Sequence, residues 1–422
     1  SSFHRESIRK KLLPLVRVAQ TLAQKYDVVV TNPPYMGASN MNSDLSEYVK
    51  KYYPDSKSDL FAVFIEVCSR MAKQNGYQAM ITQHAWMFLA SFEKLREKMM
   101  LTETVSMAHL GARAFEEIGG EVVQTTSFVR VRTHIDNFKG VYCRLIEPTT
   151  QQDKEEMFLA GENRYTANQD NFAKIPGSPV AYWASKNEID VFANNSKIDD
   201  LFETRNGMST TNNNLFLRFW FECPLNECGL GNYTAITAQK SKKRWFRYNK
   251  GGEFRRWYGN NDYVVNWKDN GAELKKYVAD RYGSYSKEIR SEDRYFFESI
   301  TWSGVTSSAT GFRYSPQGAV FDSGANGLFA KNSKLLMYLL GFLNTKITIE
   351  LVKFKNPTIN TGSGTVGKLP IDIEESKIDS VNENVRECIK LSETDWDSFE
   401  TSWDFTRHPF IKAITKYPNM MD

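Results

Sequence analysis

The chain has 422 residues, of which 41% are hydrophobic and 13% are aromatic. This length is large for one domain and predicts two or three, each with enough apolar residues to form a core. No run of roughly 18 apolar residues occurs, so an ordinary membrane-spanning helix is excluded. The first residues lack the apolar core of a signal peptide, and the five cysteines are scattered. Together these features predict a reducing, cytoplasmic location.

Helix and strand patterns alternate in the first part of the sequence. Helices are predicted at 7–25, 58–73 and 91–101, and strands at 26–30, 77–82 and 104–110. Ser58 is the predicted cap of the second helix. This alternation favours a parallel sheet with crossover helices. Two segments of alternating polarity, 122–133 and 141–146, are expected to close the sheet as an antiparallel pair.

The composition becomes polar around 147–171, which predicts a domain boundary there. The expected organisation is a catalytic α/β domain at 1–150, a linker at 151–175, a mixed α/β domain at 176–370 and a helical extension at 371–422. Within the second domain, 335–351 has the clearest helical pattern.

Four residues that could hold an amine follow the strand at 26–30. Asn32 has a side-chain oxygen acceptor, the carbonyl of Pro33 is a second acceptor, and Pro34 helps to fix that backbone. Tyr35 offers an aromatic face for a planar base. Adenine N6 is a poor nucleophile, and accepting hydrogen bonds from both its hydrogens favours a more tetrahedral nitrogen. The motif therefore predicts adenine-amine chemistry; the alternative is a turn that uses Asn and Pro for backbone reasons.

On this motif, residues 26–132 resemble the catalytic domain of gamma-class adenine-N6 DNA methyltransferases of the TaqI type. The sequence of residues 26–37 is most similar to the corresponding segment of the methyltransferases of type 1 BREX phage-resistance systems. The resemblance implies methyl transfer from S-adenosylmethionine to a flipped-out adenine, with Asn32, Pro33, Pro34 and Tyr35 as catalytic residues. It further implies that Phe115, in Leu110-Gly111-Ala112-Arg113-Ala114-Phe115, stacks on the other face of the base; the alternative is a core phenylalanine.

Enzymes of this kind need an earlier strand that ends in a Gly-rich turn, and an acidic residue on the next strand, to bind the cofactor. Neither occurs before Tyr26 in this sequence. We therefore expect a partial Rossmann-like methyltransferase sheet without its early strands, in an internal fragment of a longer protein. Most of the cofactor pocket would then lie outside this chain.

The second half resembles a target-recognition domain more weakly, at 201–207, 343–345 and 368–370. Its base-reading candidates are Arg205 and the asparagines near it, because Arg and Asn side chains recognise base edges; surface solvation and turns are the alternatives. A basic segment interleaved with aromatics at 240–256 is expected to hold phosphates, although a solvated face fits equally well. The predicted DNA-binding residues are Arg205, Asn212, Asn213, Lys240, Lys242, Lys243, Arg244, Arg247, Arg255, Arg256 and Lys368.

Two further patterns are expected to be misleading. The Gly-x-Gly-x-x-Gly match at 362–367 precedes Lys368-Leu369-Pro370, so a flexible loop is predicted there rather than a dinucleotide site. Cys223 and Cys228 lack a second pair of ligands, so no metal is expected. A structural role is expected for His84.

The leading hypothesis is thus an adenine-specific DNA methyltransferase that acts on double-stranded DNA in bacterial phage defence or host DNA marking. Other proteins of a phage-defence system are possible partners. One alternative is a non-catalytic DNA-recognition module of a defence complex. Another is methylation of RNA or of a protein amide, because the same turn can present either amine.

Overall fold

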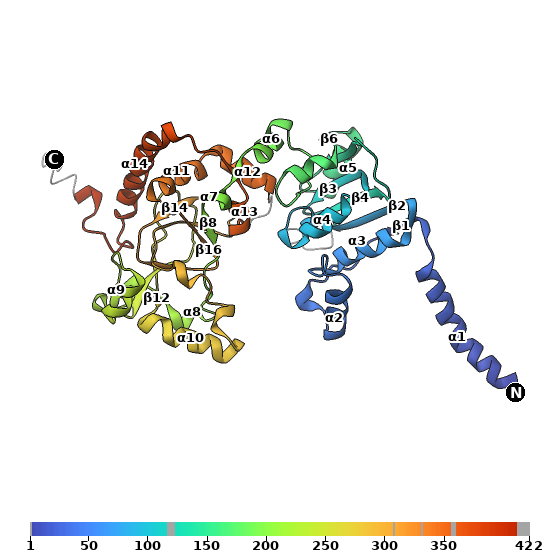
Figure 1. Ribbon diagram of the computed structural model, residues 1–422, viewed down its shortest axis with the longest axis horizontal. Coiled ribbons are helices and arrows are strands. Elements are labelled where there is room, and N and C mark those ends of the chain that lie inside the picture. Colours follow the sequence, from blue (N-terminus) through green and yellow to red (C-terminus); the bar gives the residue numbers. More distant parts are fainter. Residues whose placement is uncertain (1, 116–122, 307–308, 331, 356–359, 412–422) are drawn as a thin grey trace. The chain divides into compact units, whose positions relative to one another are not determined.

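The computed structural model describes residues 2–115, 123–306, 309–330, 332–355 and 360–411. The chain forms two compact units, Ser1–Ala193 and Asn194–Asp422. Figure 1 shows both units as mixtures of helices and strands. Each is described by itself below.

A mixed sheet forms the centre of the first unit. Its strand order is β1-β2-β4-β3-β5-β6 among the described residues. The strands are β1 (Tyr26–Thr31), β2 (Ala72–Gln83), β3 (Glu103–Gly111), β4 (Thr125–Val131), β5 (Gly140–Arg144) and β6 (Arg164–Ala167). β1 runs parallel to β2, as expected for two strands joined by a helical crossover.

The expected antiparallel pair between 122–133 and 141–146 is wrong. β4 lies between β2 and β3 and is antiparallel to both, whereas β5 pairs with β3 in parallel. Both faces of β4 contribute to the core: Phe128 and Arg130 are buried on one face, and Thr125 and Val131 on the other. The Arg130 guanidinium donates to the Thr104 hydroxyl and to the carbonyls of Met99 and Thr102. A strand buried in this way suits a central position in the sheet better than an edge.

The helices of the first unit are α1 (Ser2–Ala23), α2 (Ser43–Tyr52), α3 (Leu60–Met71), α4 (Glu93–Met99), α5 (Gln151–Ala160) and α6 (Lys186–Asn194). α3 contacts β1 and β2, and Phe61 and Ile65 on it join Trp86, Phe128 and Tyr142 in one buried cluster. The cap of α3 is Asp59 rather than the predicted Ser58, because the Asp59 carboxylate accepts a hydrogen bond from the Phe61 amide.

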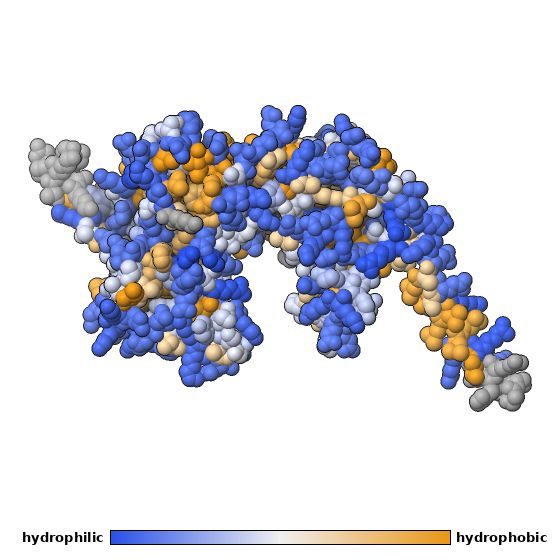
Figure 2. All heavy atoms as spheres, in the orientation of Figure 1, coloured by the Kyte–Doolittle hydropathy of each residue, from blue (hydrophilic) through white to orange (hydrophobic). Residues whose placement is uncertain are grey.

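β1 is an edge strand, and its apolar side chains are only partly covered. Val28 is 55% exposed and Val30 is 72% exposed. The preceding helix α1 also exposes apolar residues, among them Leu15, Val16 and Leu22. Figure 2 shows hydrophobic residues on the surface of α1. Exposing this much apolar surface to water is unfavourable. Such a surface is therefore typical of a region that another segment covers.

The second unit contains two larger sheets and one strand pair in its described part. The first sheet comprises β9 (Leu217–Phe219), β10 (Cys228–Gly229), β11 (Trp245–Asn249), β12 (Tyr263–Asn266) and β15 (Ala319–Phe321). The second comprises β8 (Glu203–Arg205), β13 (Ser299–Ser303), β14 (Phe312–Ser315) and β16 (Ala325–Phe329). The pair is β7 (Ser196–Lys197) with β17 (Pro370–Ile371).

The helices of the second unit are mostly short. They are α7 (Ile198–Leu201), α8 (Asn213–Phe216), α9 (Ala235–Ser241), α10 (Lys268–Tyr282), α11 (Ser333–Leu343), α12 (Lys346–Lys355), α13 (Ser363–Gly367) and α14 (Ile378–Trp396). The single helix predicted at 335–351 is in fact α11 and α12, bent by 77°. Among the described residues no single helix is long and apolar enough to cross a membrane; only this bent pair passes by length and composition, and several of its leucines are buried.

The two units divide between Ala193 and Asn194, later than the linker predicted at 151–175. The physical reason is packing within 151–175. β6 pairs with β5, and Phe172 is buried in the same core as Phe61. At the other end, α14 packs on α11, and Arg255 forms an ion pair with Asp395, so residues 378–396 are part of the second unit.

Candidate functional site

The motif Asn32-Pro33-Pro34-Tyr35 follows β1 directly, at the carboxyl end of that strand. Pro33 is buried, whereas Asn32 and Pro34 are exposed and Tyr35 is half-buried. A buried proline next to an exposed asparagine anchors the backbone and leaves the amide accessible. This end of an open α/β sheet is where ligands usually bind.

The chain after the motif is fixed to the start of α3. Asp59 Oδ1 accepts a hydrogen bond from the Met36 amide at 3.0 Å and another from the Phe61 amide at 3.3 Å. The Leu60 amide donates to the Met36 carbonyl at 3.0 Å, and the Ala38 amide donates to the Ser58 carbonyl at 3.0 Å. Burial raises the pKa of the Asp59 carboxyl, and the N–H groups that donate to it oppose that rise. One carboxylate therefore caps α3 and holds the residue after Tyr35.

Tyr35 is supported from inside the first unit. Its ring meets the Phe61 ring edge to face, with centroids 6.0 Å apart and an interplanar angle of 82°. Its buried hydroxyl has no hydrogen-bond partner among the described residues, and burial raises its pKa. The ring is thus held by packing, while an unpaired polar atom remains beside the turn.

Phe115 is half-buried and lies in the turn after β3. The preceding Gly111 has a φ of +66°, and a Cβ there would lie 2.9 Å from Ile146 Cγ2, so this position requires glycine. Among the described residues no ring contact joins Tyr35 and Phe115, and 116–122 lie outside the described part of the chain. Stacking by Phe115 stays a prediction.

Three buried side chains, those of His84, His109 and Tyr182, contact one another in sequence near the ends of β2 and β3. His84 Nδ1 and His109 Nε2 are 2.8 Å apart, and His109 Nδ1 is 3.1 Å from the Tyr182 hydroxyl. Desolvation lowers the pKa of His84 to about 4. The pKa of His109 is lowered well below its usual value, first by desolvation and then by His84, Arg144 and Lys154. Both rings are therefore neutral, and their contacts favour the structural role expected for His84.

Several predicted DNA-binding residues of the second unit have structural contacts. Arg247 is 7% exposed and its guanidinium donates to the carbonyls of Pro316 and Gln317, so it is poorly placed for phosphate. Arg205 forms an ion pair with Glu203. Asn212 caps α8 through the Leu215 amide, and Asn213 accepts a hydrogen bond from Thr210. These contacts explain the local fold without DNA.

Two of the predicted DNA-binding lysines are accessible to solvent. Lys240 and Lys242 are exposed at the end of α9. Lys243 donates to the carbonyls of Asn226 and Cys228, and Arg244 lies over the Trp245 ring. The remaining basic candidates are half-buried: Arg255 pairs with Asp395, Arg256 lies over Phe254, and Lys368 follows α13.

The glycines at 362–367 do not form the predicted flexible loop. Ser363–Gly367 is a short helix, α13. A Cβ on Gly367 would lie 2.0 Å from Asp199 Oδ2, whereas Gly362 and Gly364 have open space. Close packing therefore explains Gly367. Within the described residues no group of His, Cys, Asp and Glu could hold a metal ion.

Asp59, His109 and the contact of Phe61 with Tyr35 were not predicted from the sequence. Asp59 stands directly before an apolar helix, which is a signal for a capping residue, but Ser58 beside it carries the same signal. Phe61 and His109 have no sequence signal beyond lying on a helix and a strand, because their roles depend on tertiary contacts.

Comparison with known proteins shows which proteins this chain is similar to. The model of the Eco57I restriction-modification methylase matches residues 4–111. The adenine-specific methyltransferase PglX of Lacticaseibacillus casei (strain Zhang) is 42% identical over 414 residues, which are 96% of this chain and 34% of the relative. The predicted resemblance to adenine-specific methyltransferases of the PglX type is confirmed. BrxX of Escherichia coli O9:H4 (strain HS), also an adenine-specific methyltransferase, is 38% identical over 95% of this chain and 32% of the relative. The chain thus spans about a third of the length of these PglX-type relatives.

Solved structures show the same fold at low identity. The type IIL restriction-modification enzyme MmeI, solved in complex with DNA, has a TM-score of 0.57 and 13% identity over 90% of this chain and 50% of that one. The type ISP enzyme LlaGI, solved with a DNA substrate mimic, has a TM-score of 0.54 and 11% identity over 89% of this chain and 42% of that one. The predicted α/β methyltransferase-like fold is therefore confirmed.

Replacing Asp59 tests what holds the turn. Asp59→Ala removes the acceptor of the Met36 and Phe61 amides, so we expect a loss of about 1–2 kcal/mol of stability and faster hydrogen exchange at Met36. Asp59→Asn keeps one acceptor oxygen and should lose less. Exchange at Met36 that is unchanged in Asp59→Ala would contradict this account.

The buried histidine pair predicts sensitivity to acid. The unfolded state binds protons near the ordinary histidine pKa, whereas folded His84 binds one only near pH 4. The free energy of unfolding should therefore fall as the pH decreases from about 6.5 to about 4. Melting temperatures across this range should show a smaller decrease for His84→Gln/His109→Gln than for the wild type. His408→Gln, which changes a half-buried histidine outside this pair, should retain the full decrease.

Proposed function

We propose that this chain supplies the adenine-holding part of an adenine-N6 DNA methyltransferase, together with its target-recognition domain. The observation that carries the proposal is the accessible Asn32 amide beside a buried Pro33, in a turn held by Asp59 at the carboxyl end of β1. The names of the PglX-type relatives support the same activity. The biological role we propose is phage defence or marking of host DNA in the bacterial cytoplasm.

Each residue of the turn has a separate task in this proposal. The Asn32 side-chain oxygen and the Pro33 carbonyl accept hydrogen bonds from the two N6 hydrogens of a flipped-out adenine. Pro34 limits the backbone freedom of the turn, and Tyr35 stacks on the base while Phe61 supports its ring. Phe115 is the proposed partner on the other face. No general base is assigned, because the N6 proton can leave to water after the methyl group has transferred.

The methyl donor that we propose is S-adenosylmethionine, whose sulfonium methyl group is transferred to N6 as its bond to sulfur breaks. The donor set at the turn fits the amine side of this reaction: an exposed amide, a fixed carbonyl and an aromatic ring. β1 lies at the edge of the described sheet, which supports the idea that further strands, carrying the cofactor pocket, continue the sheet beyond this edge; the uncovered Val28 and Val30 support another layer over its face.

For the second unit we propose DNA recognition. The exposed Lys240 and Lys242 are the strongest candidates for phosphate contacts, with Lys243, Arg244, Arg255, Arg256 and Lys368 as weaker ones. Arg205, Asn212 and Asn213 would reach base edges only if they exchange their present partners. Arg247 is left out because it is buried with carbonyl partners.

The catalytic proposal is tested with the full-length protein, labelled methyl donor and double-stranded DNA. Asn32→Ala should reduce the rate of transfer by roughly 100-fold or more while DNA binding is kept, because the lost acceptor acts mainly in the transition state. Asn40→Ala, which changes an exposed asparagine outside the motif, should be close to the wild type.

Label in RNA or protein but not in DNA would contradict the leading proposal and favour an RNA or protein methyltransferase. DNA binding without any transfer by the full-length protein would favour the non-catalytic recognition module.

Cofactor binding provides a separate prediction. Because the sequence shown has no Gly-rich turn with a following acidic strand before β1, S-adenosylmethionine should bind the isolated 422-residue chain weakly or not at all. Isothermal titration calorimetry measures this directly, with the full-length protein as the positive control. Tight binding by the isolated chain would contradict a cofactor pocket formed largely outside it.

A further inference from the structure

The first unit has a second concave site, far from the Asn32 turn. It is a cavity of about 380 Å³ that lies between the β5–β6 end of the sheet, the segment 168–174 and the start of α6. Its lining residues include three lysines (Lys139, Lys174 and Lys186) and one carboxylate (Asp190). None of these residues belongs to the adenine-holding turn.

The strand directions place this cavity at the opposite end of the sheet. Lys139 comes directly before β5, and Thr166 and Ala167 end the antiparallel strand β6. β5 is parallel to β3, and through β4 and β2 it has the same direction as β1. The cavity therefore lies beyond the amino ends of the parallel strands and Asn32 beyond a carboxyl end. The edge strands β1 and β6 are also roughly 24 Å apart across the sheet, at about 4.8 Å per strand pair.

The charge around the cavity is unbalanced. All three lysines are exposed, and none of them has an ion pair among the described residues. Asp190 is the carboxylate among the lining residues, so the lining has a formal charge of about +2. Like charges brought together around one hollow repel each other, and a ligand with two negative charges would offset this repulsion.

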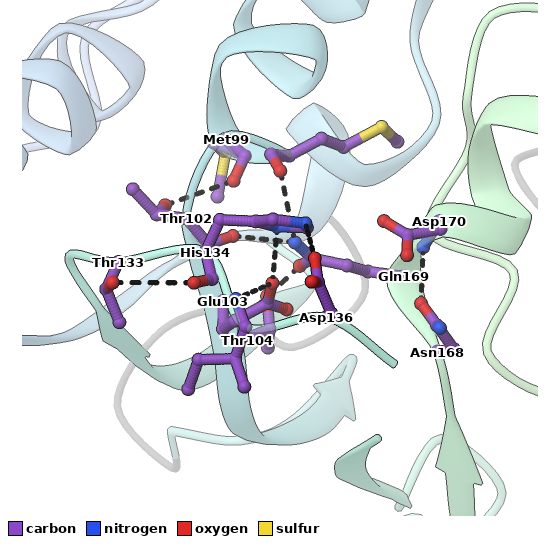
Figure 3. Close-up of polar contacts among 12 residues, drawn as sticks. Met99, Thr102, Glu103, Thr104, Thr133, His134, Asp136, Asn168, Gln169 and Asp170 are labelled. Atoms are coloured by element: carbon purple, nitrogen blue, oxygen red, sulfur yellow. Dashed lines mark hydrogen bonds and ion pairs between the residues drawn. The ribbon is translucent and has the colours of Figure 1, made fainter. Parts of the chain in front are cut away.

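The inner wall is apolar and well fixed. Phe172, Ala181, Tyr182 and Ile189 are buried, and the Tyr182 ring stacks on Tyr142 with centroids 4.9 Å apart. Gln169 fixes the segment 168–170: its amide donates to the carbonyl of Thr102 at 2.7 Å and its oxygen accepts from the Thr104 amide (Figure 3). A site that is already formed needs little ordering when a ligand binds.

Polar groups that could orient a ligand are also present. The Asn168 side-chain oxygen accepts a hydrogen bond from the Asp170 amide, as Figure 3 shows, which leaves its NH₂ group for another acceptor. Asn171 is half-buried and lines the same hollow. Asp190 can accept hydrogen bonds from hydroxyl groups, as acidic residues do from a ribose in nucleotide sites.

We propose that this cavity binds a small phosphorylated ligand of mononucleotide size, separately from the adenine-holding turn. The lysines neutralise the phosphate, the apolar wall covers the flat part of the ligand, and the amides and Asp190 contact its polar edges. The volume lies within the usual range for small-molecule sites, roughly 300–1,000 Å³. Backbone phosphates of duplex DNA are contacted mainly by charge on an open basic surface, whereas a hollow with an apolar wall fits a free ligand better.

Calorimetry with the 422-residue chain tests the proposal, using AMP, ADP and ATP as probes. We expect measurable binding that weakens at higher salt and weakens at least fivefold in Lys174→Ala and in Lys139→Ala/Lys186→Ala. Lys94→Ala, which changes an exposed lysine on α4, should bind like the wild type. Asn32→Ala should also bind like the wild type, which distinguishes this cavity from the adenine-holding turn. Circular dichroism confirms that each variant is folded.

Three results would overturn the proposal. The first is no binding of any of the three nucleotides at 1 mM, on the order of the weakest affinities usual for such sites. The second is nucleotide binding that the lysine variants leave unchanged. The third is a loss of duplex DNA binding in these variants without any nucleotide binding by the wild type, which would assign the lysines to DNA instead.

Discussion

The hydrogen bonds that Asp59 accepts are the constraint on which the candidate site depends. One carboxylate oxygen binds the amide of Met36, after the motif, and the amide of Phe61, in the first turn of α3. Phe61 in turn supports the ring of Tyr35. The position of the turn is thereby tied to the helix and, through Phe61 and Ile65, to the core of the first unit. Side chains held in this way keep their geometry before a substrate arrives.

Much of the first unit could be predicted from sequence because its strands and helices have strong local patterns. β1, β2, β3 and α3 lie close to their predicted positions. Strand order was harder: the segment of β4 has the same alternation whether it lies at an edge or between β2 and β3. The bend between α11 and α12 was also missed, because it depends on a tertiary hydrogen bond from the Asn344 amide to the Phe312 carbonyl, beside a local one from the Thr345 hydroxyl to the Phe342 carbonyl.

The candidate site likewise has parts that could be predicted from the sequence and parts that could not. The motif at Asn32 carries its chemistry in consecutive residues, so it could be found without a structure. Arg247 could not be judged, because a basic residue in a basic segment has the same sequence signal whether it is exposed or bonded to buried carbonyls. The lysines of the remote cavity come from three separate segments and become neighbours only through the pairing of β5 with β6 and the course of 168–190.

The central claim is that Asn32 holds the amine of a target adenine. Its most direct test is sequencing of N6-methyladenine in the DNA of cells that express the full-length protein, with Asn32→Ala beside the wild type. We predict methylated adenines at one recurring sequence for the wild type and none above background for Asn32→Ala. Equal methylation by both proteins would contradict the account.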